Sequence, residues 1–333
     1  MSALYPLLLR PEFVDRPWGA RDLSPVYPSH RCERPIGEVW LTGDENRVVN
    51  GPLAGRTLGE LCRQYGRALV GESARETERF PLLIKFLFPR EKLSVQVHPD
   101  DQAARRVGQP CGKTECWYVL AADPGAQVAL GLQPGITREE LARAIREIRA
   151  EELLNWVEIH PGEMIYVDAG TVHTIGPGSV LVETQQNSDT TYRLYDYGRP
   201  RELHIAEGIM AIKERTRAGK VQRQEVADQF TTLVMSPSFS VHKHRGELSI
   251  GEFETHGGVQ VVVAIGGRGV LGTGNGERLG FSLGDAVVVP GSIVRFQVSP
   301  QPEVELLTMS VPTGEVSEPT TTLPRFRTSA EAR

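Results

Sequence analysis

The feature that most constrains the fold is a repeat between the two halves of the chain. Residues 161–173, PGEMIYVDAGTVH, match residues 283–295, LGDAVVVPGSIVR, with a glycine, an acidic residue and an aliphatic run at the same spacing. The turn glycine is offset by one place, so the loop is not copied residue for residue. Residues 94–98 resemble residues 240–244 in the same way. Many short strands between glycine and proline turns predict two copies of one jelly-roll β-barrel.

The repeat suggests where the chain divides. We expect a mainly β protein with a first domain over residues 1–220 and a second domain over residues 221–333. A capping box that begins at Thr137 predicts a helical segment at about 137–157. This segment lies between strands of the first domain, so it is interpreted as a small helical insertion. Another capping box, at Thr57, predicts a helix over the following residues.

Composition narrows the class of protein. A chain of 333 residues can hold one large domain or two ordinary ones. A formal net charge of -5 argues against a protein that binds nucleic acid through a broad basic face, although it allows a local basic pocket. No apolar run approaches the ~18 residues of a membrane span, and no secretory signal pattern precedes the first strand. The four cysteines lack a CxxC spacing and predict free thiols in a reducing cytoplasm.

Two stretches of the chain carry side chains that can bind a metal. In residues 93–98 apolar and polar positions alternate, so Gln96 and His98 share one face of a predicted strand. Glu115 stands at the start of the next apolar strand, after a loop rich in glycine and proline. His173 follows the glycine turn of the first repeat. We expect these four side chains to converge.

The four residues offer two imidazoles, one carboxylate and one amide oxygen. This set suits Zn²⁺ in a catalytic site that keeps a place for water, while Mn, Co, Fe and Ni stay open. Spacing alone leaves other interpretations open, because a Gln-x-His pair is often a solvated strand face and His173 could cap its loop. In the second repeat Arg295 replaces the histidine. There, His242 and His244 lie one strand step apart but lack two ligands, so we expect no second metal site.

Beyond these residues the chain resembles a known family. The glycine–acid–strand–glycine–histidine pattern is similar to the second motif of cupins. Most of the chain resembles type I mannose-6-phosphate isomerases (phosphomannose isomerases) of the short bacterial kind. The motifs that carry this resemblance are LSVQVHPDD, GKTECWYVL, DAGTVHTIG and ETQQNSDTTYRLYDYGR. The resemblance implies two cupin-like jelly-roll barrels and one zinc ion, bound by Gln96, His98, Glu115 and His173.

The resemblance also implies a reaction, the interconversion of mannose 6-phosphate and fructose 6-phosphate through a cis-enediol. Arg193 is the expected partner of the phosphate or the enediolate, because a guanidinium forks onto anionic oxygens. Lys113, two residues before Glu115, is expected at the opening of the same site. The general base is expected to be Glu183 or a metal-bound water. Residues 195–197 are interpreted as structural residues at the rim.

Several alternatives remain at this point. Lys113 could be an exposed loop lysine, and Glu183 could be a strand-end acid paired with Arg193. The chain could be another metal-dependent cupin enzyme, such as a dioxygenase or a different sugar-phosphate isomerase, or a sugar-phosphate-binding cupin without catalysis. We expect a cytoplasmic monomer or homodimer with a small sugar-phosphate substrate and with neither nucleic acid nor membrane as a partner.

Overall fold

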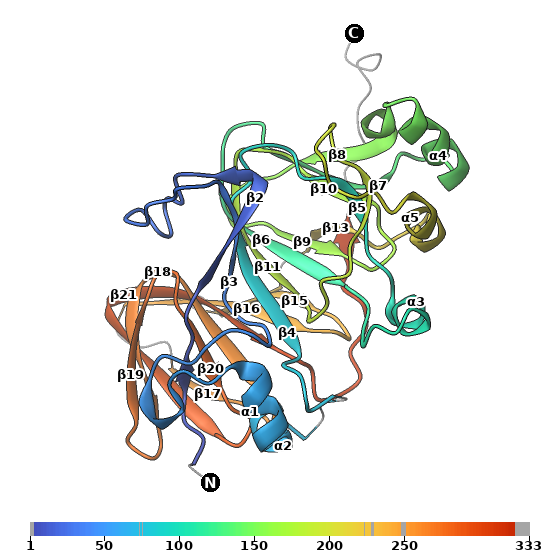
Figure 1. Ribbon diagram of the computed structural model, residues 1–333. Coiled ribbons are helices and arrows are strands. Elements are labelled where there is room, and N and C mark those ends of the chain that lie inside the picture. The colour runs from blue at the N-terminus through green and yellow to red at the C-terminus, as the bar shows by residue number, and fades with distance from the viewer. Residues whose placement is uncertain are drawn as a thin grey trace. The chain divides into compact units, whose positions relative to one another are not determined.

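The computed structural model describes residues 3–72, 74, 76–222, 224–227, 230–247 and 251–323 (Figure 1). The fold is mainly β and antiparallel, which confirms the predicted fold class. The chain divides into two compact units. The site unit comprises Arg16–Ala20, Leu87–Gln222 and Thr320–Arg333, and the second unit comprises Met1–Asp15, Arg21–Phe86 and Arg223–Pro319.

This division differs from the predicted boundaries in one respect. A break near residue 220 is present, but most of the first 86 residues group with the C-terminal half. The reason is backbone pairing, because β1 (Leu7–Leu8) pairs with β20 (Ala286–Val289). The Tyr27 hydroxyl also donates a hydrogen bond to the Gly284 carbonyl at 2.6 Å. The N-terminal segment therefore completes the unit that holds the second copy of the repeat.

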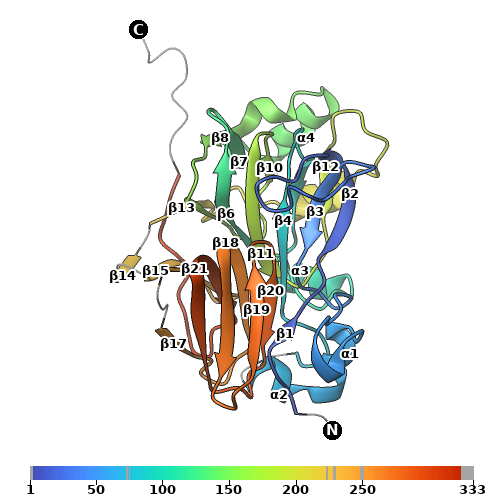
Figure 2. The ribbon, with the colours of Figure 1, turned by 90° about the vertical axis from the view of Figure 1, so that its left-hand side faces the viewer.

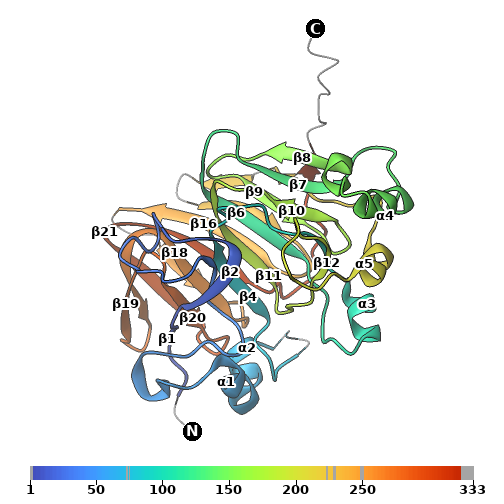
Figure 3. The same cartoon turned by 45° about the horizontal axis from the view of Figure 1, so that its top comes forward.

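The site unit is built from two groups of antiparallel strands and a few short helices (Figure 3). The strands of the five-stranded sheet run in the order β12-β5-β10-β7-β8, and β11, β6, β9, β13 and β22 neighbour one another in that order. The strands are β5 (Val95–Val97), β6 (Glu115–Ala122), β7 (Gln127–Leu132), β8 (Leu154–Glu158), β9 (Met164–Val167), β10 (His173–Ile175), β11 (Ser179–Gln186), β12 (Tyr192–Tyr195), β13 (Gly219–Val221) and β22 (Thr321–Thr322). The helices are α3 (Asp101–Arg106), α4 (Arg138–Arg146), α5 (Ile205–Ala211) and the 3₁₀ turn η2 (Ala150–Leu153).

An apolar core lies between the two groups of strands. Trp117 and Ile165 from one group and Val128 and Leu130 from the other belong to a single buried cluster. The opposite face of the five-stranded sheet packs on α4 and α5 through a second cluster. Because successive strand residues point to opposite faces, β7 and β8 contribute side chains to both clusters. Polar side chains at one end of the sheet face that contacts the first cluster are thus held by closely packed strands.

The helical insertion is shorter than predicted. Only α4 and η2 are helical, and the expected further turns around Leu154 and Val157 are wrong. These residues lie in β8, where Val157 pairs with Val128 of β7. The strand buries Val157 in the inner cluster and Leu154 in the outer one. Opposite burial of two residues three positions apart suits a strand and not a helix, in which they would share a face.

The second unit contains the other β-domain (Figure 2). Its largest sheet follows the order β1-β20-β18-β21-β16-β15-β14, with β17 paired to β21 and β19 paired to β18. Its other strands are β3 (Ile36–Trp40), β4 (Leu82–Leu87, whose last residue belongs to the site unit), β14 (Gln224–Ala227), β15 (Phe230–Met235), β16 (Ser240–Gly246), β17 (Gly251–Glu254), β18 (Gln260–Thr273), β19 (Arg278–Ser282) and β21 (Arg295–Ser310), while β2 (Glu12–Ala20) has residues in both units. Its helices are η1 (Gly51–Leu53), α1 (Leu58–Tyr65) and α2 (Arg67–Val70).

The sequence repeat has a structural counterpart. The aliphatic runs form β9 in one unit and β20 in the other, and His173 and Arg295 each begin the next strand. Arg295 is exposed and forms ion pairs with Glu252 and Glu254. On β16, His244 Nε2 lies 3.0 Å from the Thr308 hydroxyl. The same position in the fold thus carries a buried histidine in one unit and a solvent-exposed ion-paired arginine in the other.

Thr57 begins α1 with the predicted capping box. Its hydroxyl accepts a hydrogen bond from Glu60 N, and the Glu60 carboxylate accepts one from Thr57 N. Thr57→Ala is expected to lower the free energy of unfolding by about 1 kcal/mol, because the helix loses its N-cap acceptor. Chemical denaturation of this variant and of Thr57→Ser, which keeps the hydroxyl, checks this. Equal midpoints for the two variants would contradict the capping role.

Candidate metal centre

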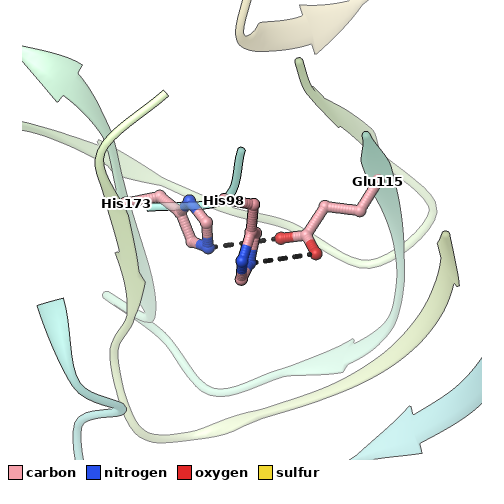
Figure 4. A group of neighbouring side chains, drawn as sticks. All are labelled: His98, Glu115 and His173. Atoms are coloured by element: carbon pink, nitrogen blue, oxygen red, sulfur yellow. Dashed lines mark ion pairs between the residues drawn. The ribbon is translucent and has the colours of Figure 1, made fainter. Parts of the chain in front are cut away.

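Three of the predicted ligands meet in the interior of the site unit. His98 directly follows β5, Glu115 begins β6 and His173 begins β10. Each side chain is only 1% exposed, and their ligand atoms all lie within 4.8 Å of one another (Figure 4). The expected convergence of these three residues is thus present, and their binding of a metal stays a prediction.

Local turns bring the first two residues together. Asp100 caps α3 by accepting a hydrogen bond from Ala103 N at 2.9 Å, and the chain then returns so that Lys113 N donates to Pro99 O at 3.0 Å. Gly112 is needed at this close approach, because a Cβ there would lie 2.6 Å from the backbone of Asp100. This return places the start of β6 beside the end of β5.

A second turn positions His173. Gly170 adopts φ +92°, a conformation that side chains other than glycine rarely tolerate, and its N–H donates to His98 O at 2.9 Å. Asp168 holds the turn by accepting a hydrogen bond from the Thr171 hydroxyl at 2.8 Å. The backbone of one histidine thus fixes the loop that leads into the other.

The orientation of the two imidazoles is set by backbone carbonyls. His98 Nδ1 lies 3.0 Å from Thr190 O, and His173 Nδ1 lies 2.9 Å from Thr171 O. A carbonyl only accepts hydrogen bonds, so each Nδ1 carries the proton and each Nε2 presents a lone pair. This arrangement is the one that metal-binding histidines usually show.

Both Nε2 atoms face the same carboxylate. His173 Nε2 is 3.2 Å from Glu115 Oε1, and His98 Nε2 is 3.5 Å from Glu115 Oε2 (Figure 4). Burial lowers the pKa of His173 to about 4, and nearby Lys113 also lowers it, so this imidazole is neutral at pH 7. Neutral imidazole lone pairs that converge with a buried carboxylate form a donor set for a divalent cation.

Gln96 lies beside these three residues on the same sheet face. It is the direct register partner of His173 on one side and of Arg193 on the other. Its amide nitrogen lies 3.2 Å from His173 Nε2, and its oxygen accepts a hydrogen bond from the Ser94 hydroxyl. A half-turn of the amide would present the oxygen to the site, and the Ser94 hydroxyl could then accept instead. Ligation by Gln96 stays a prediction.

Lys113 is buried, which excludes the exposed-loop interpretation. Its Nζ lies 3.1 Å from Glu115 Oε2 and 3.2 Å from His98 Nε2, and the residue is 4% exposed. Burial by itself lowers the pKa of Lys113, but the neighbouring carboxylates, first of all Glu115 and then Glu183, raise it above its ordinary value. The ammonium is therefore charged and sits directly against the candidate ligands.

Glu183 faces the same interior. It is the register partner of Trp117, two places along β11 from the partner of Glu115, so both carboxylates project from one sheet face. Trp117 Nε1 donates to Glu183 Oε1 at 3.2 Å. The indole ring also lies 5.6 Å from the ring of His173. Trp117 thus orients Glu183, and the only indication of this role in the sequence is an aromatic residue in a buried strand.

Arg193 lies on β12, opposite Gln96. Its Nη1 donates to Glu202 O at 2.9 Å, and its Nε is buried and has no hydrogen-bond partner within the described ranges. Burial lowers the pKa of Arg193, and nearby Arg201 lowers it further. Part of this guanidinium is thus fixed by the chain through its Nη1.

Two cysteines, Cys111 and Cys116, lie near the candidate ligands in sequence. Burial raises the pKa of Cys116 well above its ordinary value, so this residue is a poor nucleophile. Cys111 Sγ lies 3.7 Å from Asn187 O. All four cysteines are free thiols.

Comparison with known proteins agrees with this geometry. Residues 9–124 match the catalytic domain of type I phosphomannose isomerase. The chain is 40% identical over 255 residues to mannose-6-phosphate isomerase ManA of Bacillus subtilis, which is 72% of this chain and 78% of the relative. It is 35% identical over 305 residues to mannose-6-phosphate isomerase of Streptococcus mutans, which is 88% of this chain and 94% of the relative.

Solved structures share the fold. The crystal structure of mannose 6-phosphate isomerase from Bacillus subtilis superposes with a TM-score of 0.82 at 31% identity and covers 91% of this chain and 99% of that one. A zinc-bound mannose 6-phosphate isomerase gives a TM-score of 0.74 at 17% identity and covers 92% and 99%, a likeness of fold.

Fold and site together define a cupin-type jelly-roll protein with a buried His–Glu–His group. The extent of the similarity to the curated relatives makes the assignment narrower. The chain belongs to the type I phosphomannose isomerase family. Among the helices that the structure describes, none has both the length and the apolar character needed to cross a membrane.

Proposed function

We propose that this protein is a metal-dependent isomerase that interconverts mannose 6-phosphate and fructose 6-phosphate through a cis-enediol. The observation that carries the proposal is the buried group of His98, Glu115 and His173 in a chain of this family. Two imidazoles and a carboxylate, with Gln96 as a fourth ligand, fit one Zn²⁺. A metal bound there would polarise sugar oxygens or acidify a water.

The remaining groups suit the proton transfer between C1 and C2. The Glu183 carboxylate, oriented by Trp117, takes the proton from one carbon and returns it to the other. The Arg193 guanidinium, held through Nη1 by Glu202 O, binds anionic oxygens of the substrate. The Lys113 ammonium adds positive charge beside Glu115. The surrounding barrel keeps bulk water from this step.

The wider setting is part of the same proposal. We infer a cytoplasmic enzyme, supported by four free cysteines, that acts as a monomer or homodimer. The expected partner is a small sugar phosphate, and neither nucleic acid nor a membrane is expected. We also propose that the second domain binds no metal.

Removal of the metal tests the function directly. Chelation of the purified protein is expected to abolish turnover of mannose 6-phosphate in a coupled assay, and added zinc should restore it. The melting temperature should fall on chelation and recover with zinc, because a ligand that binds only the folded state stabilises it. Chelator that is already saturated with zinc serves as the control. Full turnover by the metal-free protein would contradict a metal-dependent mechanism.

A further inference from the structure

Asp196 is a buried carboxylate that the reaction itself does not use. It follows β12 directly and is 2% exposed. Arg201 binds it with two parallel hydrogen bonds, from Nε to Oδ2 and from Nη2 to Oδ1, each 2.6 Å long. Arg199 Nη1 donates to Oδ1 at 3.1 Å. Three donors on one carboxylate make a rigid, charge-assisted clasp.

The clasp closes a short loop, residues 196–204, which we call the clasp loop. Arg199 N donates to Asp196 O at 3.0 Å, and Arg201 N donates to Arg199 O at 2.8 Å. Tyr197 takes φ +55°, an uncommon conformation for a bulky residue. Its hydroxyl donates to Glu151, so the loop is tied to η2 as well.

Further contacts link the clasp loop to the segment that precedes β5. Arg199 Nη2 donates to Lys92 O at 2.9 Å and to the Glu91 carboxylate at 2.8 Å. Lys92 in turn pairs with Glu151 at 2.8 Å. These residues stand shortly before β5, so the clasp fixes the loop relative to the metal centre.

The far end of the clasp loop holds Arg193. Glu202 O accepts the hydrogen bond from Arg193 Nη1 at 2.9 Å. His204 N donates to Arg193 O at 2.7 Å, and His204 Nδ1 lies 3.4 Å from Arg193 N. Both the backbone and the guanidinium of Arg193 are therefore hydrogen-bonded to residues of the clasp loop, whose position depends on the clasp.

Charge gives Asp196 a second effect on Arg193. Arg201 is close enough to Arg193 for the two like charges to repel, and Asp196 acts in the opposite sense. With the Asp196 carboxylate in place, Arg201 is bound and largely neutralised. Without it, two guanidinium groups would compete for the same carbonyls and for the same anion.

We propose that Asp196 is a positioning residue that acts through Arg193, by locking the clasp loop so that the Glu202 carbonyl aims the Arg193 guanidinium at the substrate. This inference rests on the proposed function for its kinetic consequence. The contact between Arg193 and Glu202 does not depend on turnover, so the effect of Asp196 on this contact can be tested without an activity assay.

The test is a double-mutant cycle on metal-loaded enzyme. Asp196→Asn, which is isosteric but uncharged, is expected to lower kcat/KM by about 10- to 100-fold, mostly in kcat, with bound zinc unchanged. Asp196→Glu should recover part of the loss. In an Arg193→Lys background, Asp196→Asn should cost less than about 2-fold, because residues that act as a unit are not additive.

A matched control separates positioning from general loss of stability. Asp44→Asn breaks another Asp–Arg pair, with Arg79 at 2.7 Å in the second unit, and is expected to leave kcat unchanged. An equal loss from Asp196→Asn in both Arg193 backgrounds would overturn the proposal. So would a crystal structure of Asp196→Asn in which Arg193 still bonds Glu202 O. If wild-type enzyme shows no turnover of mannose 6-phosphate, the proposed function fails, and the crystal structure alone decides on the clasp.

Discussion

Glu115→Gln is expected to release the metal and to lower kcat/KM for mannose 6-phosphate by at least about 1000-fold. The carboxylate is the charged member of the donor set, and it faces both His98 Nε2 and His173 Nε2. Glutamine has the same shape but no charge, so the change removes attraction for a cation without opening a cavity. Loss of Lewis-acid stabilisation worth several kcal/mol corresponds to this factor in rate.

Metal analysis of the dialysed variant, together with the coupled assay, checks this expectation. Glu163→Gln is the matched control, because Glu163 also pairs with a lysine, Lys220 at 2.7 Å, and lies in the same unit. It should keep its zinc and its activity. A Glu115→Gln enzyme that still binds stoichiometric zinc and turns over normally would remove Glu115 from the site.

The same substitution should also destabilise the folded protein. Lys113 is buried against Glu115, and removal of one partner from a buried ion pair costs about 3–5 kcal/mol in comparable cases. The variant is therefore best expressed and assayed at low temperature. A chemical denaturation curve shows whether the protein in the assay is folded.

Much of the candidate site was predictable because it depends on strand alternation and short-range turns. Gln96 lies in β5 and His98 directly follows this strand, two residues later, so their shared face follows from the extended backbone. The first repeat placed His173 just past a glycine turn, and this residue begins β10. In each case, residues near one another in sequence fix the direction of the side chain.

The parts that escaped prediction depend on contacts between distant segments. The pairing of β1 with β20 joins residues from the two ends of the chain, and an apolar pattern says that a strand is buried without naming its partner. The burial of Lys113 likewise depends on how the chain returns to Pro99. Backbone acceptors such as Thr190 O leave no trace in sequence, because every residue has a carbonyl.

Arg193→Ala is expected to lower kcat/KM by about 100- to 1000-fold while the metal stays fully bound. The guanidinium contacts Glu202 O and is proposed to bind the anionic substrate, and the β12 backbone pairs with β5 whatever side chain residue 193 bears. A charge-assisted, forked contact to an anion is worth about 3–4 kcal/mol when it strengthens in the transition state, which converts to this factor. Kinetics and metal content, measured on one preparation, check both the loss in kcat/KM and the retention of the metal.

Comparison with Glu115→Gln distinguishes two possible roles of Arg193. If Arg193 acted by holding the metal centre together, zinc and turnover would be lost in parallel, as expected for Glu115. If it binds the substrate, turnover falls with zinc in place, and Arg193→Lys, which keeps the charge but not the fork, should fall in between. Arg105→Ala, on the surface of α3, is a control that should leave kcat/KM unchanged. Normal kinetics in Arg193→Ala would exclude Arg193 from substrate binding.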